Sequence, residues 1–412
     1  MKIIDIEIIP IIPRFPARNA NYQVRFQQID RRTIFKVKTD NGLVGYGDYR
    51  CSPPPMSSVE GLIDCNPFEF INGDVHLGLA GALYDVMGKY LEIPAYKLMG
   101  TKLRDRVPVA AWTRQADPEE LSREIRRAVD QEYTLFKMHT CAHYDIFEQN
   151  RAVEDVAPEG FLMQYDLNHN RTLATVLPLI KALEKSRVVG FIEDPLVLSD
   201  IDGWRQLRAK TNVPLIMHVP PLGGMQELIL GLADAYIIGE YCEGGFQDTL
   251  IRGFAYGKAN VQSVVQLTGG TLTKAFAMHL AAVLPTVGHS INLDDQYEDD
   301  ITRERIEIIE GCSPVPERPG LGFDVDEDEL ARLAANAPVE IPKHLGVLTL
   351  PGGHRLYSPS LPAIDRLTGF EEGTIRGLQF EIWHDDGSAA FLQIYERVQQ
   401  EGSFITTTLG TR

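Results

Sequence analysis

The sequence has few of the features that mark secreted or membrane-spanning proteins. Its five cysteines are odd in number and scattered, and none forms a CxxC pair (Cys51, Cys65, Cys141, Cys242 and Cys312). This argues against a disulfide framework or a thiolate zinc site. No apolar run reaches the roughly 20 residues of a membrane span, and the start, MKIIDIEIIPIIP, lacks the basic region and cleavage site of a signal peptide. We therefore expect a cytoplasmic protein with no membrane partner.

Positive charge is also scarce. Lys and Arg number 40 against 57 Asp and Glu, which gives a formal net charge of −17. Nucleic-acid binding needs a basic face that neutralises phosphates, so we expect no such partner. An anionic substrate would need a cation recruited locally. Otherwise the composition, 44% hydrophobic and 24% charged, is that of a globular protein, and 412 residues leave room for a large barrel with an accessory domain.

A repeated pattern runs through the middle of the chain, where short apolar segments end on polar or ionisable residues. The residues at these ends are Lys137 with His139, Asp166, Glu193, His218, Glu240, Gln266 and Asp294. Measured from Lys137, successive ends lie 22 to 29 residues apart. That is the length of one strand, one helix and two short loops, so the spacing predicts a repeated strand–helix unit.

Helical patterns separate these apolar segments, at 118–132, 171–186, 246–258 and 271–284. Near-continuously apolar strands alternating with helices predict a parallel sheet that is buried on both faces. Seven or eight such units in series favour a closed barrel over an open sheet. The strands of such a barrel end in one common bowl, so the polar residues at the strand ends are candidate site residues.

The N-terminal part predicts a separate element. Residues 33–50 alternate apolar and polar side chains around Asn41-Gly42, a pair typical of a tight hairpin turn. Residues 76–100 have a helical pattern that stops at Pro94 and Gly100. Together these segments indicate an α+β domain, which we place at residues 1–115.

The C-terminal part follows a Pro/Gly-rich connection at 316–330. The tail from residue 346 contains the strand-like runs GLQFEIW and AFLQIYE and no obvious chemistry. We therefore assign residues 116–320 to the barrel with its metal and catalytic site. Residues 321–412 are expected to return to the first domain and to carry a strand-rich extension.

Four local motifs resemble those of the enolase superfamily, in its mandelate racemase and muconate-lactonising branch. AGALYDVMGKYLEIPAYKLMG is similar to the helix of that family's capping domain, QYDLNHN to its third-strand Asp-x-Asn, GFIEDPL to its fourth-strand Glu-Asp-Pro, and RPGLGFDVDEDEL to its exit from the barrel. The resemblance covers about residues 1–345, and the order and spacing of the motifs make it specific. It implies a modified TIM (β/α)7β barrel with an N-terminal α+β capping domain.

The resemblance also implies a reaction. Members of this family remove a proton next to a carboxylate and hold the resulting enediolate with a magnesium ion. A hard cation in oxygen ligands stabilises that charge as it develops, and it supplies the local positive charge that an acidic protein lacks. We therefore expect Mg²⁺ as cofactor, a small-molecule carboxylate as substrate and a homo-oligomer as the assembly.

Asp166 and Glu193 match the family's first two metal ligands. The alternative is that each carboxylate has no role beyond capping the helix that follows it. The third ligand departs from the pattern, because His218 stands where the family has a carboxylate. An imidazole suits softer ions, so His218 would favour Mn²⁺ or another divalent ion, or would weaken the site. It is equally open that His218 is a polar residue of the pocket.

The base is expected on the second strand, where the family often has Lys-x-Lys and this chain has Lys137-Met138-His139. Alternation places Lys137 and His139 on one face of the strand, toward the barrel interior. His139 is the candidate base, and Lys137 is a partner of the substrate carboxylate or a second base. A neighbouring cation disfavours protonation of the imidazole, which keeps His139 in its free-base form. The alternative is a packed histidine beside a lysine that reaches to solvent.

The remaining candidates are assigned to the substrate. Asn168 matches the polar neighbour of the first ligand, and Asp294 matches an acid that hydrogen-bonds the substrate carboxylate. Glu240 and Gln266 replace the Asp and His of the racemase dyad. Six arginines of the capping region could bind an acid, and Arg25 is chosen from them as the candidate (Arg14, Arg18, Arg25, Arg31, Arg32 and Arg50). Each of them could instead be part of a solvated basic surface.

The replacement of the racemase dyad by Glu240 and Gln266 favours one reaction over another. Gln266 cannot transfer protons, so two-base racemisation is less favoured than one-base elimination of water. The leading hypothesis is therefore dehydration of an acid sugar or hydroxy acid. A racemase or epimerase of a hydroxy acid is the alternative enzyme. A non-catalytic acid-binding relic is the alternative class, because His218 and Gln266 replace family residues.

Overall fold

The computed structural model of the chain forms two compact units, each built from separated segments. Unit 1 comprises Met1–Trp112, Gln131–Leu135 and Ile216–Pro338, and unit 2 comprises Thr113–Asp130, Phe136–Leu215 and Val339–Arg412. The structure describes residues 1–19, 29, 31–169, 171–240, 245–338, 340–360, 363–364 and 375–406. Among the helices of these residues, none has both the length and the apolar character needed to cross a bilayer.

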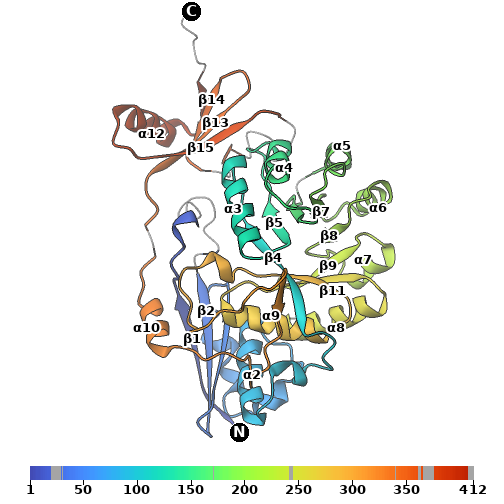
Figure 1. Cartoon of the computed structure of the whole chain (residues 1–412). Helices are drawn as coiled ribbons and strands as arrows, with labels where there is room; N and C mark the ends of the chain where they lie inside the picture. Colours follow the sequence, from blue (N-terminus) through green and yellow to red (C-terminus); the bar gives the residue numbers. More distant parts are fainter. Residues whose placement is uncertain are drawn as a thin grey trace, which may run out of the picture. The chain divides into compact units, whose positions relative to one another are not determined.

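Eight parallel strands form a closed barrel, and a helix follows each strand except the last (Figure 1). The strands are hydrogen-bonded in chain order, and the last pairs with the first to close the ring. The strands are β4 (Arg106–Thr113), β5 (Leu135–His139), β6 (Leu162–Asp166), β7 (Val189–Glu193), β8 (Leu215–Met217), β9 (Ala235–Gly239), β10 (Gln262–Gln266) and β11 (Val287–Ile291). The predicted (β/α)7β barrel is confirmed.

The helices between the strands are α3 (Pro118–Asp130), α4 (Ile146–Glu154), α5 (Leu173–Leu183), α6 (Ile201–Lys210), α7 (Met225–Leu230), α8 (Gly245–Lys258) and α9 (Thr271–Val283). The four helices expected from the sequence are confirmed, with ends shifted by three residues at most. Helix α3 shows why the pattern was readable, because Leu121, Ile125 and Ala128 recur on one face and are buried. A short strand, β12 (Cys312–Pro314), pairs antiparallel with the start of β4.

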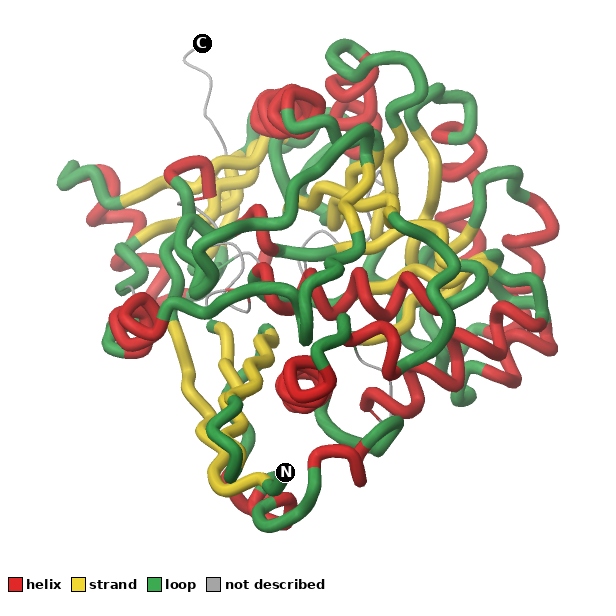
Figure 2. The backbone as a smooth tube through the Cα atoms, turned by 60° about the horizontal axis from the view of Figure 1, so that its bottom comes forward, coloured by secondary structure: helices red, strands yellow, loops and turns green. Residues whose placement is uncertain are grey.

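The N-terminal sheet of unit 1 is antiparallel, with β1 (Ile3–Ile11), β2 (Arg32–Thr39) and β3 (Val44–Tyr49) in this order. Its first strand begins near the N label in Figure 2. The predicted hairpin is confirmed, with Asn41-Gly42 in the β2–β3 turn. Helix α2 (Leu77–Leu91) packs closely on the sheet: a Cβ on Gly47 would lie 1.9 Å from the carbonyl oxygen of Gly78. Glycine is therefore required at position 47.

A buried ion network joins this sheet to the turn that precedes α9. The guanidinium of Arg32 contacts Asp48 at 2.6 Å and Asp300 at 3.0 Å, and all three side chains are almost completely buried. Asp48 also accepts a hydrogen bond from the backbone N–H of Gly270, and Asp300 accepts hydrogen bonds from the N–H and hydroxyl of Thr271. One arginine thus fixes two segments of unit 1 that are far apart in the sequence.

The end of unit 1 returns to the first strand. The 3-10 turn η7 (Asp294–Gln296) follows β11, and helix α10 (Glu327–Ala334) comes after the Pro/Gly-rich connection. The backbone N–H of Ile12 donates to the carbonyl of Leu333 at 3.3 Å, and Asn336 donates to the carbonyl of Ile12. Residues about 320 positions apart are therefore hydrogen-bonded.

The tail of unit 2 forms a four-stranded antiparallel sheet with the order β15-β13-β14-β16 (Figure 1). Its strands are β13 (His344–Thr349), β14 (Arg355–Ser358), β15 (Gln379–His384) and β16 (Phe404–Thr406). GLQFEIW overlaps β15, as expected, but the interpretation of AFLQIYE as strand-like is wrong. That run lies in helix α12 (Ala389–Glu401), which Ser388 caps by accepting from the N–H of Phe391. Phe391 and Val398 recur at helical spacing and are buried against the sheet.

The ion network of Arg32 generates a prediction about stability. Burial alone would raise the pKa of the Asp300 carboxyl, but Arg32 and the hydrogen bonds from Thr271 outweigh it and hold the pKa below its ordinary value. Asp300→Asn should lower the free energy of unfolding at pH 7 by about 3 kcal/mol, because Arg32 loses one of its two buried partners. Chemical denaturation measures this change. Asp324→Asn is the control, since Asp324 is exposed and pairs only with Arg318 at the surface.

The pH dependence follows from the depressed pKa. The contribution of Asp300 is fully present above the pKa of an unfolded aspartate, about 3.9, and is lost as the pH falls through the lower folded-state value. The difference between wild type and Asp300→Asn should therefore be complete at pH 7 and shrink below about pH 4. A difference that stays constant from pH 7 to pH 3 would contradict the role given to this carboxylate.

Candidate active site

The candidate site residues of unit 2 lie at the carboxyl ends of β5, β6 and β7. These strands are neighbours in the sheet, and the last residues of β6 and β7, Asp166 and Glu193, are register partners. Parallel strands that end at one edge bring their terminal side chains together. Lys137 and His139 are two residues apart on β5, so they share one face of the strand.

Lys137 lies between the two carboxylates. Its ammonium is 2.7 Å from Glu193 Oε2 and 3.2 Å from Asp166 Oδ2, and the side chain of Lys137 has no exposed surface. Burial alone would lower the pKa of Lys137, but the charges of Glu193 and Asp166 outweigh it and raise the pKa above its ordinary value. Lys137 is therefore held as a cation.

The imidazole of His139 is held on its Nδ1 side. Nδ1 lies 2.8 Å from Asn168 Oδ1 and 3.1 Å from Asp166 Oδ2. Since both partners are oxygen acceptors, these contacts assign the ring proton to Nδ1 and leave the lone pair on Nε2. Burial lowers the pKa of His139 well below its ordinary value, and the positive charges of Arg114 and Lys137 act in the same direction. A neutral imidazole protonated at Nδ1 can accept a proton at Nε2.

Two loops carry these groups in left-handed backbone. Asn168 and His169 have φ angles of 55° and 57°, and Asp194 has a φ of 47°. The loops are joined, because the N–H of His169 donates to the carbonyl of Asp194 at 2.9 Å, and His169 Nδ1 lies 3.1 Å from Asp194 Oδ2. Non-glycine residues in this region are strained, and such strain gathers at functional sites.

The partnership of His169 and Asp194 was missed by the sequence analysis. Burial of Asp194 raises the pKa of its carboxyl despite the hydrogen bond from His169. The pKa of His169 is also raised, because the bond and charge of Asp194 outweigh burial. The signal in the sequence was the histidine inside QYDLNHN, which directly follows Asn168. Nothing in a linear motif shows that it would reach the strand-end residue Asp194.

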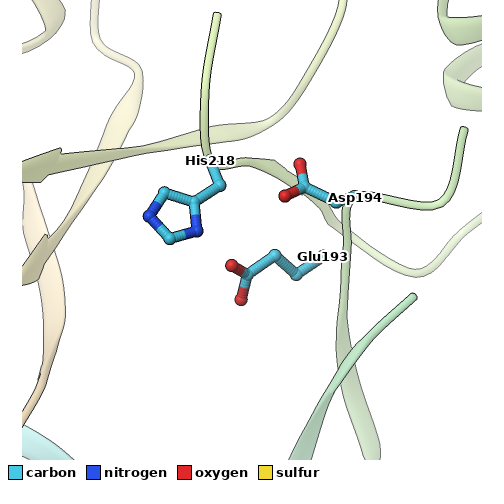
Figure 3. A group of neighbouring side chains, drawn as sticks. All are labelled: Glu193, Asp194 and His218. Atoms are coloured by element: carbon cyan, nitrogen blue, oxygen red, sulfur yellow. The ribbon is translucent and has the colours of Figure 1, made fainter. Parts of the chain in front are cut away.

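Glu193, Asp194 and His218 form a group that could hold a metal ion (Figure 3). Each offers one ligand atom, and these atoms lie within 4.8 Å of one another. Glu193 and Asp194 stand at the end of β7, and His218 directly follows β8, the next strand in the sheet. The group differs from the expected one in having Asp194 in place of Asp166.

The chemistry of the donors fits a divalent cation. Asp166, Glu193 and Asp194 are three buried carboxylates. The cation Lys137 contacts Asp166 and Glu193, and the imidazole of His169 contacts Asp194. The elevated pKa of Asp194 shows that its charge is costly in the absence of further positive charge. Carboxylate oxygens suit Mg²⁺ or Mn²⁺, and an imidazole shifts the preference toward ions that accept nitrogen.

The candidate residues of unit 1 form their own hydrogen-bonded group. Glu240 accepts from the side-chain amide of Gln266 and from the hydroxyl of Thr268, both at 3.0 Å. Arg50 forms an ion pair with Glu240. The amide nitrogen of Gln266 also lies 3.5 Å from His218 Nε2. The structure therefore brings together three of the predicted residues, Glu240, Gln266 and His218.

Glu240 directly follows a glycine that no other residue can replace without strain. Gly239 has a φ of 105°, and a Cβ there would lie 2.5 Å from the carbonyl oxygen of Gln266. The close approach of the two strands places Glu240 beside Gln266, and the N–H of Glu240 donates to that same carbonyl at 2.8 Å. The position of Glu240 is thus set by its backbone as well as by Arg50.

Four arginines of the capping region are ion-paired. Arg14 pairs with Asp299, Arg18 with Asp295, Arg32 with Asp48 and Asp300, and Arg50 with Glu240. Arg25, the one chosen from the sequence, lies outside the described residues. Of this group Arg50 is the one that contacts a predicted site residue, and the sequence analysis had named it only as a member of the cluster.

Asp294 lies just beyond β11, in η7. Its carboxylate accepts from Lys274 at 3.0 Å, and burial raises the pKa of Asp294. Both residues line a cavity of about 370 Å³ in unit 1, together with Tyr133, Arg305 and five other residues. The ion pair with Lys274 therefore holds the carboxylate of Asp294 at the wall of this cavity.

Comparisons with known proteins identify the family. The family model described as "Enolase C-terminal domain-like" matches residues 120–329. A D-galactonate dehydratase from Verminephrobacter eiseniae is 34% identical over 228 residues, which are 47% of this chain and 59% of that protein. An N-succinyl-L-Arg/Lys racemase from Bacillus cereus is 25% identical over 368 residues, 81% of this chain and 98% of that protein.

Solved structures agree on the fold. The crystal structure of the N-succinyl Arg/Lys racemase from Bacillus cereus has a TM-score of 0.68 with 21% identity, over 82% of this chain and 99% of that one. A mandelate racemase/muconate lactonizing family protein from Azoarcus sp. EbN1 gives the same TM-score and identity over the same fractions. The chain therefore belongs to the enolase superfamily, in its mandelate racemase and muconate-lactonising branch.

Proposed function

We propose that this chain removes the α-proton of a small carboxylate substrate and that the most favoured outcome is loss of water from an acid sugar or hydroxy acid. The observation that carries the proposal is the state of His139. Its Nδ1 is held by Asn168 and Asp166, and its lowered pKa keeps Nε2 unprotonated near neutral pH. A general base must be free to accept a proton at the operating pH.

The other residues of the site take supporting roles. Glu193, Asp194 and His218 would hold a divalent ion, which supplies positive charge to the substrate carboxylate and acidifies its α-proton. Lys137 keeps Glu193 and Asp166 in place as a buried cation, so it acts as an electrostatic partner and not as a second base. Arg50, fixed by Glu240, is a candidate contact for a polar part of the acid.

Racemisation is the second candidate, and the match to the racemase over 98% of its length favours it. The chemistry of β10 opposes it. A two-base racemase needs a proton carrier on each side of the substrate, but Gln266 is an amide that donates to Glu240 and cannot exchange protons. Incubation in deuterated water separates the two reactions: a racemase returns labelled substrate, and a dehydratase converts the substrate to a keto acid.

The first prediction of this proposal concerns the base. His139→Asn should reduce α-proton exchange with solvent by about 10²-fold or more, because an amide cannot accept the proton. Metal affinity should remain close to that of the wild type. Mass spectrometry of acids incubated in deuterated water measures the exchange. His344→Asn, at a partly exposed position on β13, is the control, and equal exchange rates in all three proteins would remove His139 from the role of base.

A second prediction concerns the ion. Glu193→Gln should weaken Mg²⁺ and Mn²⁺ binding by about 10²-fold, because a neutral amide retains the shape and loses the charge that a hard cation needs. Isothermal titration calorimetry measures the affinities, and circular dichroism checks the fold. Glu119→Gln, on the exposed face of α3, should leave both affinities unchanged. Retained affinity in Glu193→Gln would rule out Glu193 as a ligand.

A third prediction concerns His218. A metal-bound histidine must lose its proton, so acidification should weaken metal binding in the wild type. His218→Ala should bind Mn²⁺ more weakly, should lose preference for Mn²⁺ over Mg²⁺ and should show less dependence on pH. Titrations between pH 5.5 and 8 test all three effects, with His354→Ala as control. Identical profiles for wild type and His218→Ala would show that His218 lies outside the coordination shell.

A further inference from the structure

The loop between β5 and α4, residues 140–145, is buried along its whole length. It begins directly after His139 and ends at Asp145, the N-cap of α4. A loop of six consecutive buried residues is unusual, because loops ordinarily run over the protein surface. Another part of unit 2 must therefore cover it.

The covering element is the C-terminal sheet. Cys141 and Tyr144 of the loop share one apolar cluster with three residues of the sheet, Leu348, Leu356 and Phe380, and with Ile364 and Leu378 from the connection between β14 and β15. The ring of Phe380 lies 4.5 Å from that of His143 and 5.6 Å from that of Tyr144, between ring centres. The opposite face of the sheet packs on α12, so its two faces have different partners.

A polar contact fixes the same loop at its end. Asp145 caps α4 by accepting a hydrogen bond at Oδ1 from the N–H of Phe147. Its other oxygen, Oδ2, accepts from Arg376 Nε at 2.7 Å and from the N–H of Gly377 at 3.0 Å. The Arg376 guanidinium also lies 4.4 Å from the centre of the Phe147 ring. Burial would raise the pKa of Asp145, but these donors outweigh it and hold the pKa below its ordinary value. One carboxylate therefore binds both the helix and the sheet.

The other end of the loop is bonded to the site. The N–H and hydroxyl of Thr140 donate to the carbonyl of Asp166 at 2.9 and 3.0 Å. Asn168 donates to the carbonyl of Thr140 at 3.2 Å, and the same side chain holds His139 through its oxygen. Contacts thus run without interruption from Arg376 through the loop to His139.

We propose that the C-terminal sheet is a positioning element for the base, and that Arg376 and Phe380 act on His139 through the loop 140–145. The assignment of His139 as base rests on the proposed function. The matched family model ends at residue 329, before β13 begins, so this device is additional to the barrel. Displacement of a reacting group by about 1 Å can cost 10²-fold in rate, which is why a fixed loop matters beside a base.

The test compares two arginines of the C-terminal sheet and its helix. Arg376→Ala removes the contacts with Asp145 and Phe147. Arg397→Ala is the matched control, because Arg397 also pairs with a carboxylate, Glu401, and covers a ring, Phe404, but these partners lie in α12 and β16 and not in the loop. Arg376→Lys retains the charge and should rescue part of the loss.

Hydrogen exchange followed by mass spectrometry measures local opening of the loop directly. Arg376→Ala should accelerate amide exchange across residues 140–147 by about tenfold, as expected when a charged hydrogen bond is lost, with the melting temperature little changed. It should also shift the His139 ring signal in NMR spectra at fixed pH. In turnover, kcat for α-proton exchange should fall by about tenfold with KM unchanged. Arg397→Ala should behave as the wild type.

The outcomes separate this inference from the proposed function. Equal loop exchange in Arg376→Ala and Arg397→Ala would overturn the inference, whatever the activity. Accelerated loop exchange with an unchanged His139 signal and unchanged kcat would overturn it as well. A wild-type protein that exchanges no α-proton of any acid would refute the proposed function, and the positioning of His139 would then be decided by the exchange data and the NMR signal.

Discussion

The buried ammonium of Lys137 is the constraint on which the ends of β5, β6 and β7 depend. Asp166 and Glu193 are register partners on neighbouring parallel strands, so their negative charges are forced together at a site that water does not reach. Like charges in such a place repel strongly, and one of them would ordinarily protonate. Lys137, on β5, contacts both carboxylates, and its positive charge offsets their mutual repulsion. One cation against Asp166, Glu193 and Asp194 leaves an excess of negative charge that suits a divalent ion.

The same cluster explains why the base is neutral. A histidine 3.1 Å from a carboxylate would ordinarily gain a proton and charge. Here the carboxylate of Asp166 is shared with Lys137, and burial, Arg114 and Lys137 all disfavour the imidazolium. Asp166 therefore orients the ring without charging it. Its backbone carbonyl accepts the bonds from Thr140, so one residue fixes both the ring and the loop beyond it.

The barrel could be predicted from the sequence because its signals are local and repeated. Strand ends recur at nearly constant spacing, so position and alternation place Lys137, His139, Asp166 and Glu193 near the strand ends, whereas the roles predicted for them came from the resemblance to the family. The pairing of His169 with Asp194 could not be predicted, since it requires three non-glycine residues in left-handed backbone. Arg50 could not be selected from six arginines, because its contact with Glu240 joins residues 190 positions apart. AFLQIYE was misread because so short an apolar run fits both the strand period of two residues and the helical period of about 3.6. The N-cap residue of the helix, Ser388, lies just before this run.

The return of α10 to the first strand has a consequence for biosynthesis. Ile12 is hydrogen-bonded to Leu333 and Asn336, and unit 1 is completed only by residues up to Pro338. At translation rates of about 5–20 residues per second, the partners of Ile12 emerge roughly 15–65 s after it. During that interval β1 can already pair with β2, but the backbone groups of Ile12 lack their partners Leu333 and Asn336. The ribosome thus delivers every barrel strand before α10 can contact the end of β1, so this contact forms long after β1 itself is synthesised.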